Sequence, residues 1–258
     1  MSELFSIQLQ NRQQQGRDGV WLDLPTTTEQ VQAALRQIGI SSDNPQGLFI
    51  SGYFAEEEKR FAIPYNMVLA SNVDALNFLA AQLETLSAGE RAELNAALQA
   101  PQSELSSIGR ITDFPENVDY YVHLPDVHGP AQLGDYYLNR SGMVDMPEEW
   151  KGGIDTAQFG RYVAQQEQGA FTQYGYLVKS GDEWQKVHEG QPVPEEYRVL
   201  SFPVPEVLRD AANIPPPVQP EMEPQKIIPI ILNGKDSAER MKEITDRLET
   251  GIQELFDS

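Results

Sequence analysis

The chain has 258 residues, of which 40% are hydrophobic, and its 39 acidic and 19 basic residues give a formal net charge of -20 and an isoelectric point near 4.4. This composition predicts a soluble protein with folded cores in two or three small domains, whose charge repels nucleic acid and anionic membranes and favours a basic partner. The sequence shows no membrane-spanning run, no export signal and no cysteine, so we expect a cytoplasmic location and exclude disulfides and thiolate sites.

The first part of the chain has the pattern of a small sheet with one helix. Thr27 and Gln30 can form a capping box at the start of the helix, and Gly39 can end it. We expect strands over residues 3–9, 19–23 and 46–54. Together these elements predict an α+β domain over residues 1–64.

The middle of the chain has helical periodicity, which predicts a mainly helical and acidic domain over residues 65–124. The first helix has a leucine stripe, and each of the two helices opens with a possible capping box. The stripe residues are Leu76, Leu79 and Leu83, and the boxes are Ser71 with Asp74 and Ser87 with Glu90.

A third domain, again α+β, is predicted over residues 125–202. We expect helices in "GDYYLNRSGM" and in "IDTAQFGRYVAQQ", the second capped by Asp155, and strands in "GAFTQYGYLVKSG" and "EEYRVLSF". Residues 203–226 are rich in proline and predict a semi-rigid linker. The remaining residues, 227–258, predict an isolated helical tail whose apolar stripe has no partner after it.

Acidic residues concentrate in the middle of the chain. Residues 61–160 hold 14 acidic and 4 basic residues, so half of the net charge lies there. Asp113, Glu116 and Asp119 stand three residues apart with no basic residue between them. Such acids are either a solvated face or a binding surface for a basic partner.

Motifs of catalysis and of cofactor binding are absent from the sequence. The three histidines, His123, His128 and His188, do not have the spacing of metal ligands, and no nucleophile or phosphate-binding motif is present. We therefore predict a protein that is not an enzyme and that holds no metal or cofactor.

Three segments carry a family resemblance: "GVWLDLPTTTEQVQAALRQIGI", "DYYLNRSG" and "MPEEWKGGIDTAQFGRYVAQQEQGAFTQYGYLV". In this order they resemble signatures of the ArdA antirestriction family, and the likeness covers roughly residues 3–181. The resemblance implies an elongated protein of three domains that forms a homodimer through the third. It also implies surface carboxylates that imitate the phosphates of bent B-form DNA and occupy the DNA-binding groove of type I restriction-modification enzymes, which protects an incoming mobile element.

The spacing of the acids is compatible with such imitation. Carboxylates three apart on an α-helix advance about 4.5 Å, against roughly 3.4 Å between phosphates along one DNA strand. The chain departs from the family where acids are expected after the tyrosine pair, because Asn139 and Arg140 stand there. We predict a DNA-mimic surface that consists of Asp113, Glu116, Asp119, Asp126, Asp135, Asp145, Glu148, Glu149 and Asp155.

Aromatic residues of the signatures have an expected role in structure. Trp21 and Asp23 belong to the first signature. The two later signatures contain four aromatic residues that support the mimic surface, form the dimer contact or lie in the core: Tyr136, Tyr137, Phe159 and Tyr162. Two other functions are open from the residues alone. One is an acidic interaction module of a larger mobile-element protein, and the other is a hydrolase that uses two carboxylates.

Overall fold

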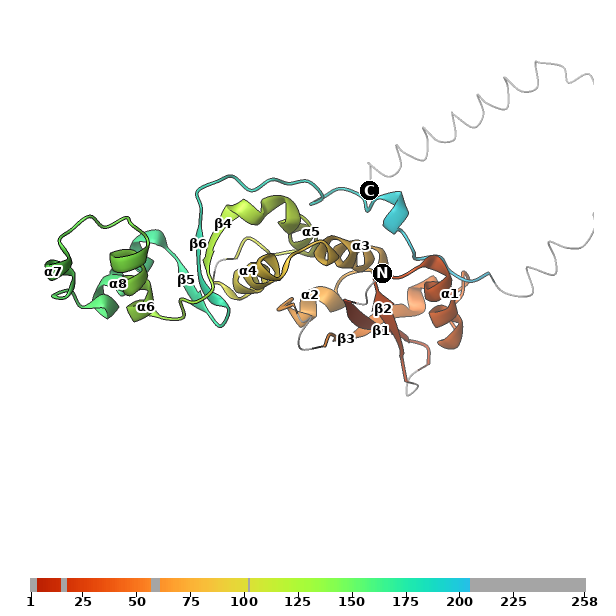
Figure 1. Cartoon of the computed structure of the whole chain (residues 1–258). Coiled ribbons are helices and arrows are strands. Elements are labelled where there is room, and N and C mark those ends of the chain that lie inside the picture. The colour runs from red at the N-terminus through yellow and green to blue at the C-terminus, as the bar shows by residue number, and fades with distance from the viewer. Residues whose placement is uncertain (1–3, 15–17, 57–60, 102, 205–258) are drawn as a thin grey trace, which may run out of the picture. The chain divides into compact units, whose positions relative to one another are not determined.

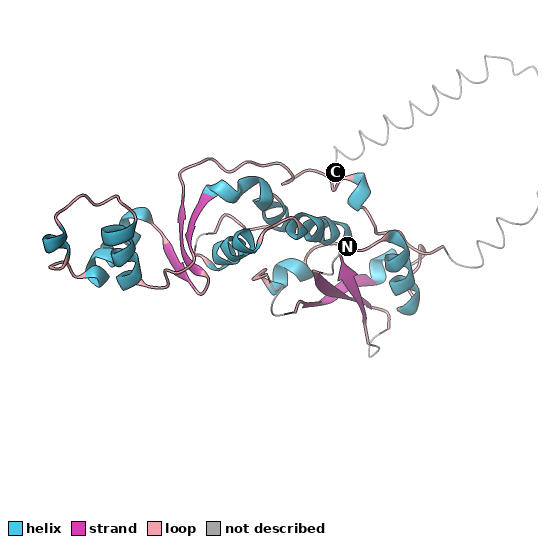
Figure 2. Cartoon of the chain, viewed as in Figure 1, coloured by secondary structure: helices cyan, strands magenta, loops and turns pink. Residues whose placement is uncertain are grey.

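The computed structural model describes residues 4–14, 18–56, 61–101 and 103–204. The chain divides into two units, residues 1–211 and 212–258, and every described residue belongs to the first. This part combines helices with two small antiparallel sheets (Figure 1, Figure 2), so the predicted α+β class is confirmed. None of the helices within the described ranges is long and apolar enough to cross a membrane.

The first sheet has the strand order β2-β1-β3. The elements of this region are β1 (Phe5–Asn11), β2 (Val20–Leu24), α1 (Thr28–Gln37), the 3-10 helix η1 (Pro45–Gly47) and β3 (Leu48–Phe54). Side chains alternate along β1, so Ile7 is buried in one cluster with Leu35 of α1. The capping box is confirmed, because the Thr27 side chain accepts from the Gln30 N–H and the Gln30 side chain from the Thr27 N–H. Gly39 has φ +67° just after the helix, as its predicted role requires.

The α-helices described in the next part of the chain are α2 (Tyr65–Leu69), α3 (Val73–Glu84), α4 (Ala88–Gln99) and α5 (Ile108–Thr112). The predicted leucine stripe of α3 is buried at all three positions. The capping box of Ser87 and Glu90 at the start of α4 is confirmed. These two local signals predicted α3 and α4 correctly.

The capping box predicted at Ser71 and Asp74 is wrong. Helix α3 is capped by Asn72, whose side chain accepts a hydrogen bond from the Ala75 N–H at 2.8 Å. The Asp74 carboxylate instead accepts from the backbone N–H groups of Val199 and Leu200, at 2.8 and 2.7 Å. Asp74 thus bonds the backbone of Val199, 125 residues away in sequence, instead of forming the predicted capping box with Ser71.

The second sheet has the order β4-β6-β5, and its strands are β4 (Tyr121–Leu124), β5 (Ala170–Thr172) and β6 (Gly175–Lys179). Strand β4 follows the 3-10 helix η3 (Phe114–Tyr120) and was not predicted, because it lies inside the segment assigned to helices. It pairs with β6 from Tyr121 opposite Lys179 onward. The strand predicted in residues 195–202 is wrong, since the segment holds the 3-10 helix η5 (Glu195–Tyr197) and then irregular backbone.

Helices of the last region are α6 (Pro130–Asp135), the π-helix η4 (Tyr136–Arg140), α7 (Glu148–Lys151) and α8 (Thr156–Glu167). Asp155 caps α8 as predicted. Helices α6 and α8 touch backbone to backbone at two glycines. A Cβ on Gly160 would lie 1.8 Å from the Pro130 carbonyl oxygen, and one on Gly134 would lie 1.9 Å from that of Thr156. The glycines of the "GDYY" and "FGR" sequences are therefore what lets these helices pack.

Residues 180–204, which we call the return strap, run back from the second sheet to the first with only η5 as regular structure. Four side chains of the helical region bond its backbone: Asp74, Asn77, Asp113 and Asn117. Near its end the Pro203 carbonyl oxygen accepts from the Ser42 N–H at 2.9 Å. The strap thus ties the second sheet to α1 and the first sheet.

Two hydrophobic clusters fill the described part of the chain. The larger one joins the first sheet, α1 and the central helices with Leu177 of β6 and Val199 of the strap. The smaller one consists of Val127, Leu133 and Tyr176 with a few partly buried neighbours. The domain limits at residues 64 and 124 stay predictions. Apart from Pro203 and Val204, the linker of residues 203–226 and the tail of residues 227–258 lie outside the described residues.

Candidate functional site

The candidate site is built on η3, which holds two of the predicted acids. Phe114 is fully buried at its start, and the buried Asn117 donates to the Gln185 carbonyl oxygen at 3.0 Å and accepts from the Gln185 N–H at 2.7 Å. These contacts hold η3 against the return strap. Glu116 and Asp119, by contrast, are exposed.

A hollow of about 440 Å³ opens between η3 and the start of the return strap. We call it the acidic hollow; its lining residues are Glu116, Asn117, Asp119, Tyr120, Asp182, Glu183 and Gln185. Four of them are acids and none is basic. In the described part of the chain no salt bridge involves Glu116, Asp119 or Glu183, and Asp182 is bonded by the Ser180 hydroxyl at 3.0 Å. Two carboxylates from each segment therefore converge without a cation to neutralise them.

Asp182 and Glu183 were missed by reasoning from the sequence. They follow β6, and they reach the hollow because β6 pairs with β4, which directly follows η3. The available signal was the "SGDE" turn after a predicted strand. The pairing that brings this turn beside η3 depends on β4, and β4 was not predicted.

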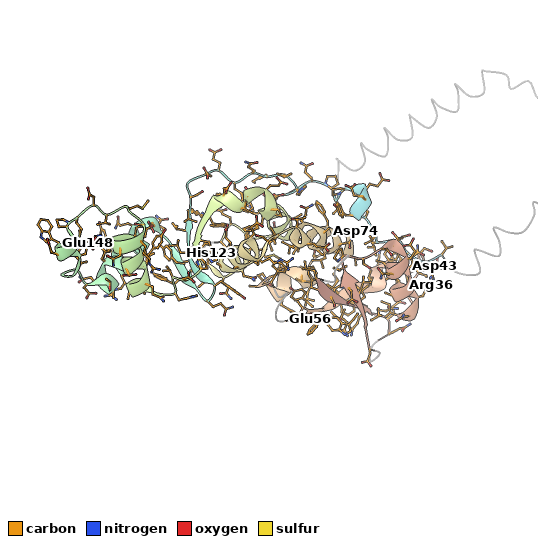
Figure 3. All side chains as sticks on the ribbon, in the orientation of Figure 1. Arg36, Asp43, Glu56, Asp74, His123 and Glu148 are labelled. Atoms are coloured by element: carbon orange, nitrogen blue, oxygen red, sulfur yellow. The ribbon has the colours of Figure 1, made fainter. Side chains whose placement is uncertain are left out.

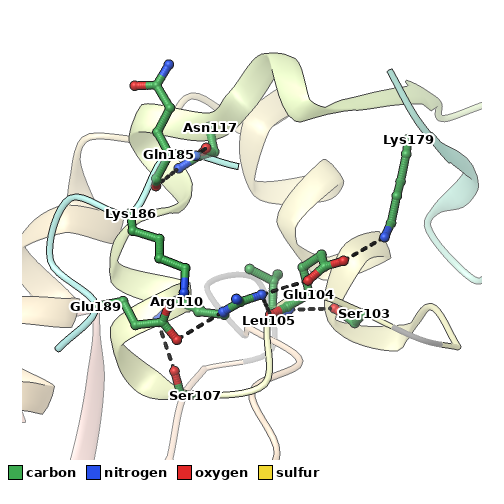
Figure 4. A network of polar contacts seen from close by, with 10 residues as sticks. All are labelled: Ser103, Glu104, Leu105, Ser107, Arg110, Asn117, Lys179, Gln185, Lys186 and Glu189. Carbon is green, nitrogen blue, oxygen red and sulfur yellow. Dashed lines mark hydrogen bonds and ion pairs between the residues drawn. The ribbon is translucent and has the colours of Figure 1, made fainter. Parts of the chain in front are cut away.

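The neighbouring basic residues are committed to other acids (Figure 4). Arg110 bonds Glu104 at 2.7 Å and Glu189 at 3.0 Å, and Lys179 bonds Glu104 at 2.7 Å. The hydrogen bond from Lys179 is the main reason why the pKa of Glu104 is lowered, with Arg110 acting in the same direction. Lys186 in turn lies 3.3 Å from Glu189. These cations are held inside a network of their own, which leaves the acidic hollow negative.

The negative potential extends from the hollow to α4. Burial is the main reason why the pKa of Glu93 is raised to about 7, and the charges of Glu90 and Asp119 contribute in the same direction. One carboxyl oxygen of Glu93 is buried without a hydrogen-bond partner among the described residues. Near neutral pH this group is protonated in part of the molecules.

The prediction that Asp113 belongs to the mimic surface is wrong. This residue is 0% exposed, and its carboxyl group accepts from the backbone N–H groups of His188 at 2.5 Å and Glu189 at 3.2 Å. The regular spacing of the three acids placed it with Glu116 and Asp119. The chain turns between α5 and η3 at this residue, however, and the return strap covers it.

The remaining predicted acids are exposed or half-buried, but several have partners (Figure 3 labels Glu148 on α7). Asp135 pairs with Arg140 at 3.0 Å and accepts from Asn139 at 2.8 Å. Glu148 pairs with Lys151 at 2.6 Å. Of the two residues that depart from the family pattern, Arg140 offsets the negative charge of Asp135, and Asn139 occupies one of its carboxylate oxygens.

Four of the predicted acids in this region are free of salt bridges within the described ranges: Asp126, Asp145, Glu149 and Asp155. All four are exposed. Asp155 differs from the other three, because its carboxylate accepts from the N–H groups of Ala157 and Gln158 as the cap of α8. Its first task is therefore structural.

The predicted aromatic residues separate into two groups. Tyr136 packs against the smaller cluster, and the Tyr137 hydroxyl donates to Glu167, which also accepts from Tyr176 at 2.9 Å. Burial, together with these bonds to Glu167, raises the pKa of both phenols. Phe159 is half-buried.

Tyr162, by contrast, is 60% exposed on α8, and Trp150 on α7 is 68% exposed. Trp21, from the first signature, is also exposed, while Asp23 accepts from the Ser6 hydroxyl at 2.8 Å. These exposed aromatic side chains do not serve the core.

A family model described as "Antirestriction protein (ArdA)" matches residues 15–178, which is more than half of the chain. A search of curated proteins finds no match. The matched segment includes strands β2 and β3 of the first sheet, the central helices, η3 and the α6–α8 crossing. It ends at β6, just before the return strap. The chain therefore belongs to the ArdA antirestriction protein family.

Proposed function

We propose that this protein is a DNA mimic that occupies the DNA-binding groove of a type I restriction-modification enzyme and catalyses no reaction itself. The observation that supports this most directly is the acidic hollow, where four carboxylates from two segments converge without a basic lining residue. A groove that binds DNA is lined with lysine and arginine, and most of its affinity comes from phosphate contacts. Exposed carboxylates can satisfy the same basic side chains.

The backbone of η3 is kinked between its two exposed acids. Asn117 has φ -129° and ψ 26°, so Glu116 and Asp119 do not belong to one continuous helix. The advance of about 4.5 Å in a regular α-helix therefore does not describe their spacing. Their support for the proposal is that both are exposed and line the same hollow as Asp182 and Glu183.

The proposed surface continues with the exposed acids Asp126, Asp145 and Glu149. It acts in the cytoplasm, where the restriction enzyme meets the DNA of an incoming mobile element. We also propose a homodimer that forms through the region of α7 and α8. The exposed apolar side chains there, Trp150 and Tyr162, support this contact.

The test compares two triple variants with the same change in charge. The first removes charges of the hollow with Glu116→Gln, Asp119→Asn and Glu183→Gln. The control removes three exposed charges elsewhere with Asp43→Asn, Glu195→Gln and Glu196→Gln. Binding to a purified type I restriction-modification enzyme is measured between 50 and 200 mM salt, with and without competing duplex DNA.

We expect the hollow variant to bind between about tenfold and a hundredfold more weakly, since each exposed ion pair contributes up to about 1 kcal/mol. Its affinity also depends less steeply on salt than that of the unmodified protein. The control changes affinity by less than about threefold. Equal losses in both triples, or undiminished binding beside saturating DNA, would contradict the mimic.

A further inference from the structure

The outer face of the first sheet exposes an aromatic pair that the core does not need. The strand register places Trp21, Gln8 and Gly52 in one row across the sheet. The next row on the same face holds Asp23, Ser6 and Phe54. Trp21 is 48% exposed and Phe54 is 56% exposed, although the intervening residues Leu22 and Ile7 point into the core.

The two rings are packed together over the sheet. Their centroids lie 6.4 Å apart in an edge-to-face arrangement. A Cβ on Gly52 would lie 3.0 Å from the outer edge of the Trp21 indole, so the indole reaches across β1 to β3. This glycine leaves the space in which the indole lies, and the result is an apolar platform on a solvent-facing sheet surface.

Among the residues that the structure describes, the charge beside this platform is negative. Asp23 is exposed beside the pair, and its carboxylate is oriented by the Ser6 hydroxyl at 2.8 Å. The basic residues described before residue 57 are Arg12 and Arg36, and neither belongs to these two rows. Arg12 lies 5.5 Å above the Phe49 ring, beyond the rows that hold the pair.

An indole face beside a carboxylate is a good receptor for a guanidinium group. Arginine stacks on aromatic rings and bonds carboxylates at the same time, and tryptophan is the strongest aromatic partner for a cation. A carboxylate alone is equally suited to lysine and arginine, but the flat ring favours the planar cation. The negative charge of the face also disfavours a nucleic-acid occupant.

We infer that the Trp21–Phe54 face, together with Asp23, is a second contact surface of the protein that receives an arginine side chain from the basic DNA-binding groove of the restriction enzyme. The inference rests on the proposed function, because it extends the same interface to the first sheet. It differs in chemistry, since cation–π attraction and apolar contact supply the binding here. Salt screens such contacts less than exposed ion pairs.

The test distinguishes binding through the π face of Trp21 from the structural role of the same side chain in covering Gly52. Trp21→Leu keeps an apolar side chain over the glycine without a π face, and Trp21→Tyr keeps the π face. We expect Trp21→Leu to weaken binding to the purified restriction enzyme by about tenfold, and Trp21→Tyr by about twofold to threefold. The loss is similar at 50 and 200 mM salt, whereas the triple variant of the acidic hollow shows a flatter salt dependence. Thermal unfolding measures any loss of folding in either variant.

Three results would overturn the inference. Leucine and tyrosine variants that bind equally well show that the ring only covers Gly52. A loss that disappears at high salt assigns the effect to charge. A change in the molar mass of Trp21→Leu by light scattering assigns the face to self-association. If the unmodified protein does not bind the enzyme at all, the proposed function itself fails, so the two failures are distinguishable.

Discussion

Asp113 is expected to stabilise the fold rather than to bind a partner, and the substitution Asp113→Ala tests this. Its fully buried carboxyl group accepts two backbone hydrogen bonds from the return strap, at 2.5 and 3.2 Å. Hydrogen bonds to charged groups contribute about 1.5–3 kcal/mol, and an N–H left buried without an acceptor costs about 1–3 kcal/mol. Because the second bond is long, we expect the free energy of unfolding to fall by about 3 kcal/mol.

The measurement is urea unfolding followed by circular dichroism at neutral pH. Asp113→Asn keeps the shape and one acceptor oxygen, so it should lose about half as much. Asp119→Ala is the matched control, because this acid lies six residues away and is exposed, and it should change stability by no more than about 0.5 kcal/mol. Amide hydrogen exchange should also become faster at His188 and Glu189 in Asp113→Ala.

The reasoning is refuted if Asp113→Ala unfolds within 0.5 kcal/mol of the control. It is also refuted if Asp113→Ala keeps its stability but loses affinity for the restriction enzyme. That result would return the residue to the binding surface.

Three further outcomes follow from the geometry. The pKa of Glu93 is raised from 4.5 to about 7, mainly by burial, so this group makes the fold less stable as pH rises between these values. At pH 8 the free energy of unfolding of Glu93→Gln should therefore exceed that of the unmodified protein by about 1–2 kcal/mol, after allowance for partial exposure. In urea titrations at pH 4 this difference should vanish. Gly160→Ala should disturb the packing of α6 against α8 and lower the melting temperature by several degrees. The control Gly89→Ala, whose Cβ would have nothing within 4 Å, should leave the melting temperature unchanged or raise it. Equal effects of the two substitutions would contradict the close contact of α6 and α8 at their glycines. Light scattering should give about twice 28.9 kDa for the intact chain and a lower mass for Trp150→Ser, and a monomeric intact chain would remove the dimer from the proposal.

Local signals in the sequence predicted much of the fold. The capping boxes at Thr27 and Ser87 and the cap at Asp155 depend on residues within three positions of each other, and all are confirmed. The leucine stripe of α3 was likewise visible as a period. Each of these elements is decided by its own residues.

Features that depend on distant residues were not predictable in the same way. Strand β4 is short and exists because β6 pairs with it, and the Ser71 box failed because Asp74 bonds a segment 125 residues away. Regular spacing placed Asp113 at the surface, although the strap buries it. The acidic hollow needed both β4 and the strap, so only half of its acids were expected.

The return strap also has a consequence for the order in which the protein can fold during its synthesis. Its contacts join residues that are far apart in sequence, such as Asn77 with Tyr197 and Gln32 with Ser201, which are 120 and 169 positions apart. Until the return strap has left the ribosome, Asp113 lacks its backbone partners at residues 188 and 189, Asn77 lacks the Tyr197 carbonyl, and part of the larger cluster stays uncovered. Contacts of this separation form slowly, so the nascent chain exposes apolar surface for most of its translation. The fold is completed by its last described residues, and chaperones that hold nascent chains have a long interval in which to bind it.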